Sequence, residues 1–307
     1  SLDAQVFSVT EQFALPNELS ESSGTIFYNN KLITHNDSGN NNVLYELDLE
    51  TELVTRVITI IGATNVDWED MAQDDSSIYI GDFGNNSGDR TDLKVYKISK
   101  SDYLSSETIN AQTIAFSYSD QTEFTPVSAN NTEWDSEAIV SFDSANLILF
   151  SKNWIDGTTI AYLIPKTLGT YVILPMPTTL NSGGLISGGT YNPLTEKLFL
   201  VGYTNLLQPF IWRSEGFNGN DIFSGSNTQT LLSSFGFEQT EGITYVNENR
   251  YFITSESFIQ SIFSDYAKLI AFSTKRKELI FFISVLVPSS GSPTFLTETF
   301  ASHRSDP

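Results

Sequence analysis

Three glutamates recur at one position of a repeated strand pattern, and carboxylates arranged in this way are suited to binding a cation. When five similar stretches are aligned on their second strands, the equivalent residues are Ser23, Glu69, Glu137, Ser187 and Glu241. Carboxylates brought close together must take up protons or pair with a cation. Calcium prefers six to eight oxygen ligands and needs no nitrogen or sulfur ligand of the kind zinc favours. The pattern therefore predicts a Ca²⁺ site. The alternative is a solvated cluster of acids that binds no ion.

In the first of the five stretches, two residues are candidates for the ligand position. Glu21 lies two residues before Ser23 and is an alternative at the same position.

The repeats show which elements would bring this position together from five segments. The clearest copy runs from residue 65 to 90, with an acid-rich entry, a strand, a polar turn and an apolar strand ending in a Gly/Asn/Asp loop. Apolar residues occur in β-branched and aromatic runs, not at helical spacing. Four copies contain four predicted strands each, and the fifth contains three. The predicted fourth strands span residues 56–61, 113–118, 171–175 and 230–235.

The N-terminal segment supplies the strand that the fifth copy lacks. Residues 6–15 precede the first copy as an unpaired apolar strand. A ring of repeats closed by such a strand leaves no long exposed edge. The sequence therefore predicts an all-β protein, a five-bladed β-propeller over residues 1–273 closed by its N-terminal strand. Residues 274–307 are predicted to be a tail or linker, although the apolar run 279–287 competes for the outer edge of blade five. That run is too short to span a bilayer.

Composition narrows the possible partners. The 307 residues carry a net charge of -21, which disfavours nucleic acid and anionic membranes. The chain has no cysteine and two histidines, so a thiolate site, a disulfide or a histidine-rich zinc site is not expected. It opens without methionine and is rich in Asn, Ser and Thr, which favours a secreted or cell-surface protein. We expect a monomer without membrane insertion.

Loops next to the glutamates form a candidate ligand face. Residues 37–40 and 82–85 both follow the pattern Asp-x-Gly-Asn at the same place in successive copies. Such loops are typical of β-turns, and they would alternatively present oxygens to sugar hydroxyls or a second cation. Tryptophans beside the acids would stack on a ligand or pack in the core. The residues of this face are Asp37, Asp82, Asn85, Trp68, Trp134 and Lys152.

Residues for proton transfer are few. His35 is a possible general base, or a hydrogen-bonded residue at the rim. Asp135 and Glu137 fall on one side of an extended strand and would form an acid/base pair or ligate a metal. No catalytic residue is assigned from the sequence.

Several motifs carry a resemblance to known propellers. The matching stretches are Glu21-Ser-Ser-Gly, Trp68-Glu69 with Ile78-Tyr-Ile-Gly, Glu137-Ala-Ile, Ser187-Gly-Gly-Thr-Tyr-Asn-Pro and Glu241-Gly-Ile-Thr-Tyr. At the level of these motifs, most of residues 20–273 resembles the calcium-activated nucleotidase (apyrase) family of five-bladed propellers, which hold an axial calcium. The strings Asn-Asp-Ser-Gly-Asn, Asp-Trp-Glu-Asp and Gly-Asp-Phe-Gly-Asn-Asn are similar to secreted Bacteroidetes propellers of unknown activity.

The resemblance implies an axial metal more directly than it implies an activity. The nucleotidases grip phosphates with basic residues, whereas here the equivalent loops offer only Lys152. Two functions follow. The first is a calcium-binding module for a glycan, peptide or small molecule, and the alternative is a calcium-dependent phosphate ester or anhydride hydrolase.

Overall fold

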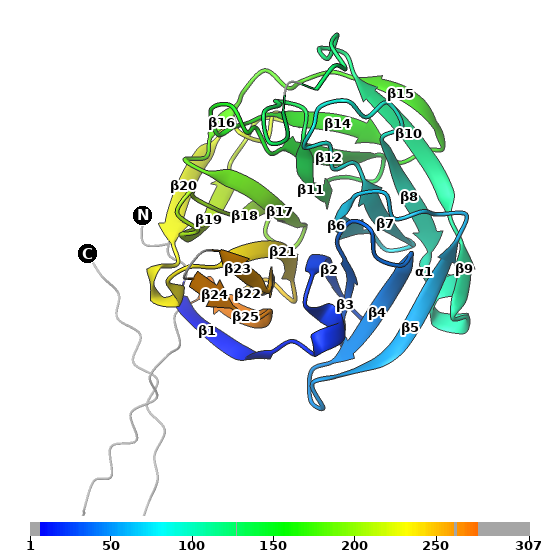
Figure 1. Cartoon of the computed structure of the whole chain (residues 1–307), viewed down its shortest axis with the longest axis vertical. Coiled ribbons are helices and arrows are strands. Elements are labelled where there is room, and N and C mark those ends of the chain that lie inside the picture. The colour runs from blue at the N-terminus through cyan, green and yellow to red at the C-terminus, as the bar shows by residue number, and fades with distance from the viewer. Residues whose placement is uncertain (1–6, 127, 261–262, 276–307) are drawn as a thin grey trace, which may run out of the picture.

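The computed structural model describes residues 7–126, 128–260 and 263–275, which fold almost entirely as β-strands. Figure 1 shows the strands as sheets arranged around a central axis. The five-bladed β-propeller predicted from the sequence is confirmed. The predicted tail from residue 276 onward, including the run 279–287, lies outside the described residues.

Each blade is an antiparallel sheet whose first strand is innermost. Blade one consists of β2 (Ser22–Tyr28), β3 (Lys31–Asn36), β4 (Val43–Asp48) and β5 (Leu53–Ile61). Blade two consists of β6 (Trp68–Gln73), β7 (Ser77–Asp82), β8 (Lys94–Ser99) and β10 (Gln112–Tyr118). Blade three consists of β11 (Ser136–Ser141), β12 (Asn146–Ser151) and β14 (Ala161–Pro165). Blade four consists of β17 (Leu185–Asn192), β18 (Lys197–Tyr203), β19 (Pro209–Glu215) and β20 (Ser226–Leu231).

Blade five closes the ring with both ends of the described chain. It consists of β21 (Gln239–Tyr245), β22 (Arg250–Glu256), β25 (Lys268–Ser273) and β1 (Phe7–Ala14). The N-terminal β1 pairs antiparallel with β25, and the Leu15 amide continues the contact by donating to the Ala267 carbonyl at 2.8 Å. The predicted closure by the N-terminal strand is therefore confirmed.

Two short strands cover the outer edges of neighbouring blades. The sequence analysis assigned residues 171–175 to blade three, but β15 (Gly169–Ile173) pairs in parallel with β10 of blade two. In the same way, β9 (Thr108–Asn110) pairs in parallel with β5 of blade one. The side chain of Ile173 is 2% exposed, so this docking buries apolar surface and also satisfies an open sheet edge.

The fourth strand of blade four also differs from the prediction. It spans Ser226–Leu231, which pair with Glu215 to Phe210 of β19, so the predicted strand 230–235 overlaps it only at residues 230 and 231. Ser233–Phe235 forms the short 3-10 helix η3 instead.

The remaining elements are short connections. They are the 3-10 helix η2 (Asn17–Leu19), the helix α1 (Lys100–Ser105), and the strands β13 (Thr158–Thr159), β16 (Leu180–Asn181), β23 (Phe258–Gln260) and β24 (Phe263–Asp265). Within the described ranges, no helix has the length and apolar character needed to cross a bilayer.

A buried carboxylate joins three blades at the middle of the channel. Asp70 is 0% exposed and accepts backbone N–H groups of Met71 at 2.8 Å and of Ile139 and Gly189 at 3.0 Å each. These donors belong to blades two, three and four. A cavity of about 20 Å³ lies among the inner strands, which is room for about one water molecule. The centre of the channel is therefore closed.

Candidate metal centre

All five residues aligned in the sequence analysis lie in a β-bulge of an innermost strand. In β6, for example, Trp68 pairs with Asp82 and Met71 with Ile80, so Glu69 lies in the extra segment. The equivalent bulges contain Ser23, Glu69, Glu137, Ser187 and Glu241. A bulge re-aims the side chain of the extra residue and is common beside functional sites. Ser23, and not Glu21, occupies this position in blade one.

The same repeat offset identifies two further rings of residues. In each blade, the residue just before the bulge pairs with one residue of the second strand. The residues that come directly after that partner in the sequence are Asp37, Phe83, Lys152, Tyr203 and Glu256. The residues two positions before the bulges are Glu21, Asp67, Asp135, Leu185 and Gln239. The sequence analysis did not assign Asp67, Tyr203 or Glu256 to a site, although applying one offset to every blade would have found them.

We call the carboxyl groups gathered at this end of the channel, together with one lysine, the acidic cup. Its members are Asp37, Asp67, Glu69, Asp135, Glu137, Lys152, Glu241 and Glu256. The three bulge glutamates are each 7–8% exposed. The structure thus brings Glu137 close enough to Glu69 and Glu241 for its charge to help raise the pKa of both.

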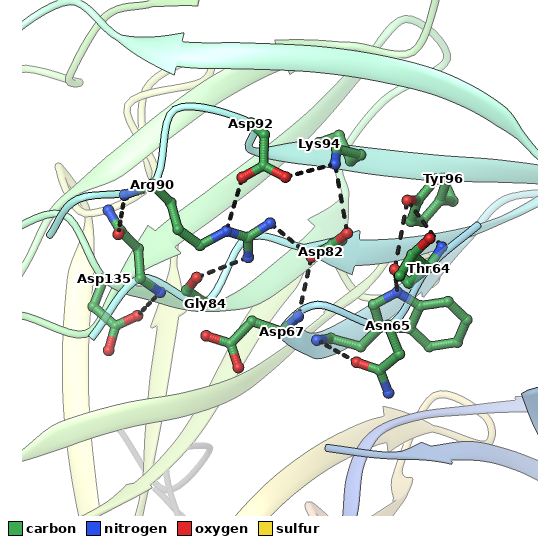
Figure 2. Close-up of polar contacts among 12 residues, drawn as sticks. Thr64, Asn65, Asp67, Asp82, Gly84, Arg90, Asp92, Lys94, Tyr96 and Asp135 are labelled. Atoms are coloured by element: carbon green, nitrogen blue, oxygen red, sulfur yellow. Dashed lines mark hydrogen bonds and ion pairs between the residues drawn. The ribbon is translucent and has the colours of Figure 1, made fainter. Parts of the chain in front are cut away.

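Asp37, Asp67 and Glu69 form the tightest group in the cup. One carboxylate oxygen of each lies within 4.8 Å of the others. Asp37 accepts the Ser38 amide at 2.5 Å, while the carboxylates of Asp67 and Glu69 accept no hydrogen bond and form no ion pair within the described part of the chain. Figure 2 shows the Asp67 backbone N–H donating to Asp82, while no hydrogen bond or ion pair to its carboxylate is marked among the residues drawn. Three oxygen ligands at this spacing could hold one cation.

Gly84 allows the loop after β7 to lie against these carboxylates. A Cβ atom at this position would come 2.1 Å from Glu69 Oε1 and 2.4 Å from Asp67 Oδ2. Any larger residue would therefore displace the two carboxylates. The glycine of the Asp-Phe-Gly-Asn loop therefore leaves room for both carboxylates in their present positions.

The blade-three side of the cup is already neutralised by a lysine. Lys152 Nζ donates to Glu137 Oε2 at 2.5 Å and to the Tyr203 hydroxyl at 3.3 Å, and it lies 4.9 Å from the centre of the Trp154 ring. Asp135 accepts the Trp154 indole N–H at 2.6 Å. The uncompensated charge is consequently concentrated on blades one, two and five.

Burial and mutual repulsion favour the protonated forms of the remaining acids. Burial, with Asp37 and Asp135 adding repulsion, raises the pKa of Asp67 to about 7. Burial and the nearby Asp37 raise the pKa of Glu256 to about 7. The pKa values of Glu69 and Glu241 are raised well above the usual range, first by burial and then by neighbouring carboxylates. Near neutral pH these groups need either protons or a cation.

The two bulge serines connect neighbouring blades. Ser23 Oγ donates to the Glu69 carbonyl at 2.5 Å, and Ser187 Oγ donates to the Thr240 carbonyl. Their hydroxyl protons are therefore used in contacts between inner strands. Glu21 is exposed and accepts the Asn40 amide at 2.7 Å.

Most of the candidate ligand face is structural. Asp82 is 0% exposed and pairs with Arg90 at 2.9 Å, and the Asn85 side chain donates to the Trp134 carbonyl at 3.1 Å (Figure 2 shows the Asp82–Arg90 pair). Trp68 is 0% exposed and lies in the core. Of this face, Asp37 and Lys152 belong to the cup. Partly buried Trp134 packs against a core cluster.

His35 is not a rim residue. It is 0% exposed, its ring lies edge-on to Trp68 at 5.4 Å, and burial lowers its pKa to about 4.

Comparison with known proteins supports the fold of this protein but gives no information about the chemistry of the site. Neither a known family nor a curated protein matches the sequence. Many solved structures resemble the fold. The PQQ-bound aldose sugar dehydrogenase of Streptomyces coelicolor has a TM-score of 0.52 and 10% identity, covering 88% of this chain and 98% of that one. A glucose dehydrogenase has a TM-score of 0.48 and 9% identity over 86% and 99% of the two chains. The Malassezia sympodialis allergen Mala s 1 has a TM-score of 0.45 and 9% identity over 86% and 92%. At such identities the likeness establishes the class of protein as a β-propeller and nothing finer.

Proposed function

We propose that this propeller binds one calcium ion through Asp37, Asp67 and Glu69 and uses the ion to hold a ligand at the end of the channel. The observation that carries the proposal is that the Asp67 and Glu69 carboxylates are largely buried, close together and without a partner in the described chain. Such charges are costly unless a cation neutralises them. Three carboxylates leave several of calcium's six to eight positions for water or for ligand oxygens.

The ligand class follows from the charge of the cup. A neutral or hydroxyl-rich molecule would complete the coordination of the ion without meeting repulsion from the other acids. Extracellular modules commonly bind calcium with dissociation constants of about 10⁻⁴–10⁻³ M. The acidic sequence, rich in Asn, Ser and Thr, also favours an extracellular protein, so we propose a binding module that works outside the cell as a monomer.

A calcium-dependent phosphate hydrolase is the alternative. A phosphate ester would have to enter a cup in which Lys152 is the one basic member, and that lysine is paired with Glu137. The ion alone would offset the repulsion from the remaining carboxylates. This imbalance favours a binding module over an enzyme.

The cofactor of the sugar dehydrogenase does not fit the cup either. Pyrroloquinoline quinone is a polycarboxylate, and a site dominated by partly buried acids would repel it. We derive no redox step from that likeness.

Calorimetric titration of chelator-treated protein tests the proposal. Calcium should bind with one-to-one stoichiometry, and Glu69→Gln should weaken binding at least about tenfold because one charged ligand is lost. The exposed Glu107 is far from the cup in sequence and fold, so Glu107→Gln is the matched control and should bind normally. Equal calcium heats for Glu69→Gln and wild type would refute the assignment.

A phosphate-release assay with ATP, ADP, UDP and phytate, with and without calcium, separates the two functions. We expect no calcium-dependent release. Release that is lost in Glu69→Gln would establish the hydrolase instead.

A further inference from the structure

A hollow lies at the end of the channel opposite the acidic cup. Its volume is about 780 Å³, within the range of small-molecule sites. It is lined by residues from all five blades, at or beside the turns that join the first and second strands. Because the acidic cup lies where the innermost strands begin and this hollow lies where they end, the closed channel separates them. We call this hollow the turn-side bowl.

Aromatic rings form much of the bowl. Tyr28, Phe142, Tyr191 and Tyr245 line it from blades one, three, four and five, and all four are partly buried. The rings of Phe142 and Tyr191 pack against each other, with their centres 5.2 Å apart. Partly buried aromatic rings at the wall of a hollow supply apolar surface for the C–H groups of a ring-shaped ligand.

The polar groups among these rings lack partners. The hydroxyls of Tyr28, Tyr191 and Tyr245 take part in no hydrogen bond within the described residues. Lys100 is 8% exposed, and its Nζ lies 4.2 Å from the centre of the Tyr28 ring without an ion pair in the described chain. Asp75 is exposed and likewise unpaired there. Both donors and acceptors are therefore available to one ligand.

The balance of charge selects a neutral ligand. Lys166 Nζ is already bound to Asp74 at 3.0 Å and to the Ser141 hydroxyl at 2.8 Å. The charged groups of the bowl that form no ion pair in the described chain are Lys100, Asp75 and Asp143, the last of which accepts backbone N–H groups of Ala145 and Asn146. An anionic ligand would approach the two exposed carboxylates and a strongly acidic protein, whereas a cationic ligand would meet Lys100.

From these observations we infer that the turn-side bowl is a binding site for a neutral saccharide. A sugar ring places C–H groups on the aromatic faces and its hydroxyls against the free phenols, Lys100 and Asp75. This site is independent of calcium, because Asp70 and the closed channel lie between it and the cup.

Titration of calcium-free protein with neutral trisaccharides, followed by NMR and calorimetry, tests the inference. The panel contains maltotriose, cellotriose, xylotriose and chitotriose, with a trigalacturonate as the anionic comparison and a peptide digest as the comparison of another class. We expect at least one neutral trisaccharide to bind at millimolar concentration, with chelator present. The trigalacturonate should bind more weakly because of its charge.

Variants assign the binding to the bowl. Tyr245→Ala should weaken saccharide binding about tenfold, since it removes one stacking face and one hydroxyl. Tyr28→Phe removes only an unpartnered hydroxyl, so it should fold normally and still weaken binding. Glu107→Gln, at an exposed position outside both the bowl and the acidic cup, is the matched control and should leave saccharide affinity unchanged.

The inference fails if no neutral trisaccharide binds, if only the peptides or the trigalacturonate bind, or if both tyrosine variants bind like wild type. Loss of calcium binding in Glu69→Gln is measured separately, so failure of either site is distinguishable from failure of the other.

Discussion

The individual carboxylates of the cup determine what this end of the channel can bind. Asp67 and Glu69 lack partners in the described chain, whereas Glu137 has Lys152 and Asp135 has the Trp154 indole. Similar acids at equivalent repeat positions therefore differ in role. The three aligned glutamates thus differ in their surroundings, because an internal cation, Lys152, is paired with Glu137 and not with Glu69 or Glu241.

Stability without calcium should fall as the pH rises. Burial and Asp37 raise the pKa of Glu256 to about 7, and Asp67 has a similar value, so the folded state keeps protons that the unfolded state has released. Between the unfolded pKa near 4 and the folded pKa near 7, the free energy of unfolding should decrease with rising pH by up to about 1.4 kcal/mol per pH unit for each group. Urea unfolding in chelator from about pH 5 to about pH 7.5 measures this slope.

Glu256→Gln should make the free energy of unfolding decrease less steeply with rising pH. Added calcium should also reduce this decrease, because the ion favours the deprotonated acids. A carboxyl such as Asp74 behaves differently. Although burial acts to raise its pKa, Lys166 and Tyr79 hold it below the usual range, so its effect appears only below about pH 4. A free energy of unfolding that stays level or rises with pH in chelator would contradict the account of the cup.

At the scale of elements, the bulge and the turn decide where side chains point. The bulge in each innermost strand orients the residue at one repeat position, which in three blades is a glutamate of the cup. The turn at the other end of the same strand contributes residues that line the turn-side bowl. One hairpin per blade therefore builds both candidate sites.

The blade repeats and the equivalence of the five aligned positions were predictable because turn residues and apolar runs recur locally at fixed spacing, whereas the bulge at these positions was not predicted. The partner of β15 was not predictable in this way. An apolar strand indicates that it pairs with the edge of some sheet, but its sequence does not indicate which sheet. The local pattern at Ile173 is the same whether it docks on blade two or blade three. Likewise, the sequence gives Lys152 no sign that it pairs with Glu137, since that contact depends on how blade three meets the axis.

Removing apolar contacts from β15 should destabilise the fold in a position-specific way. Ile173 is 2% exposed and packs in the cluster between blades two and three, so Ile173→Ala should lower the free energy of unfolding by about 2–4 kcal/mol. Its neighbour Val172 is 70% exposed, and Val172→Ala should change stability by less than about 0.5 kcal/mol. Denaturant titration of both variants makes the comparison. Equal effects would contradict the docking of β15 on blade two.

At the scale of the whole molecule, the propeller is a ring with two separate ends. Closure by β1 removes a sheet edge, and parallel β9 and β15 cover two more. Asp70 joins blades two, three and four through their backbone N–H groups at the centre. The rigid ring fixes the acids of the cup close together, which a flexible loop carrying the same charges would not do.

A crystal structure of the protein grown with calcium, with anomalous scattering recorded for the metal, tests the central claim most directly. The account predicts one anomalous peak bounded by Asp37, Asp67 and Glu69, at about 2.3–2.6 Å from an oxygen of each. Lys152 should remain paired with Glu137. A structure without a peak among these three carboxylates, or with calcium only on exposed acids elsewhere, would contradict it.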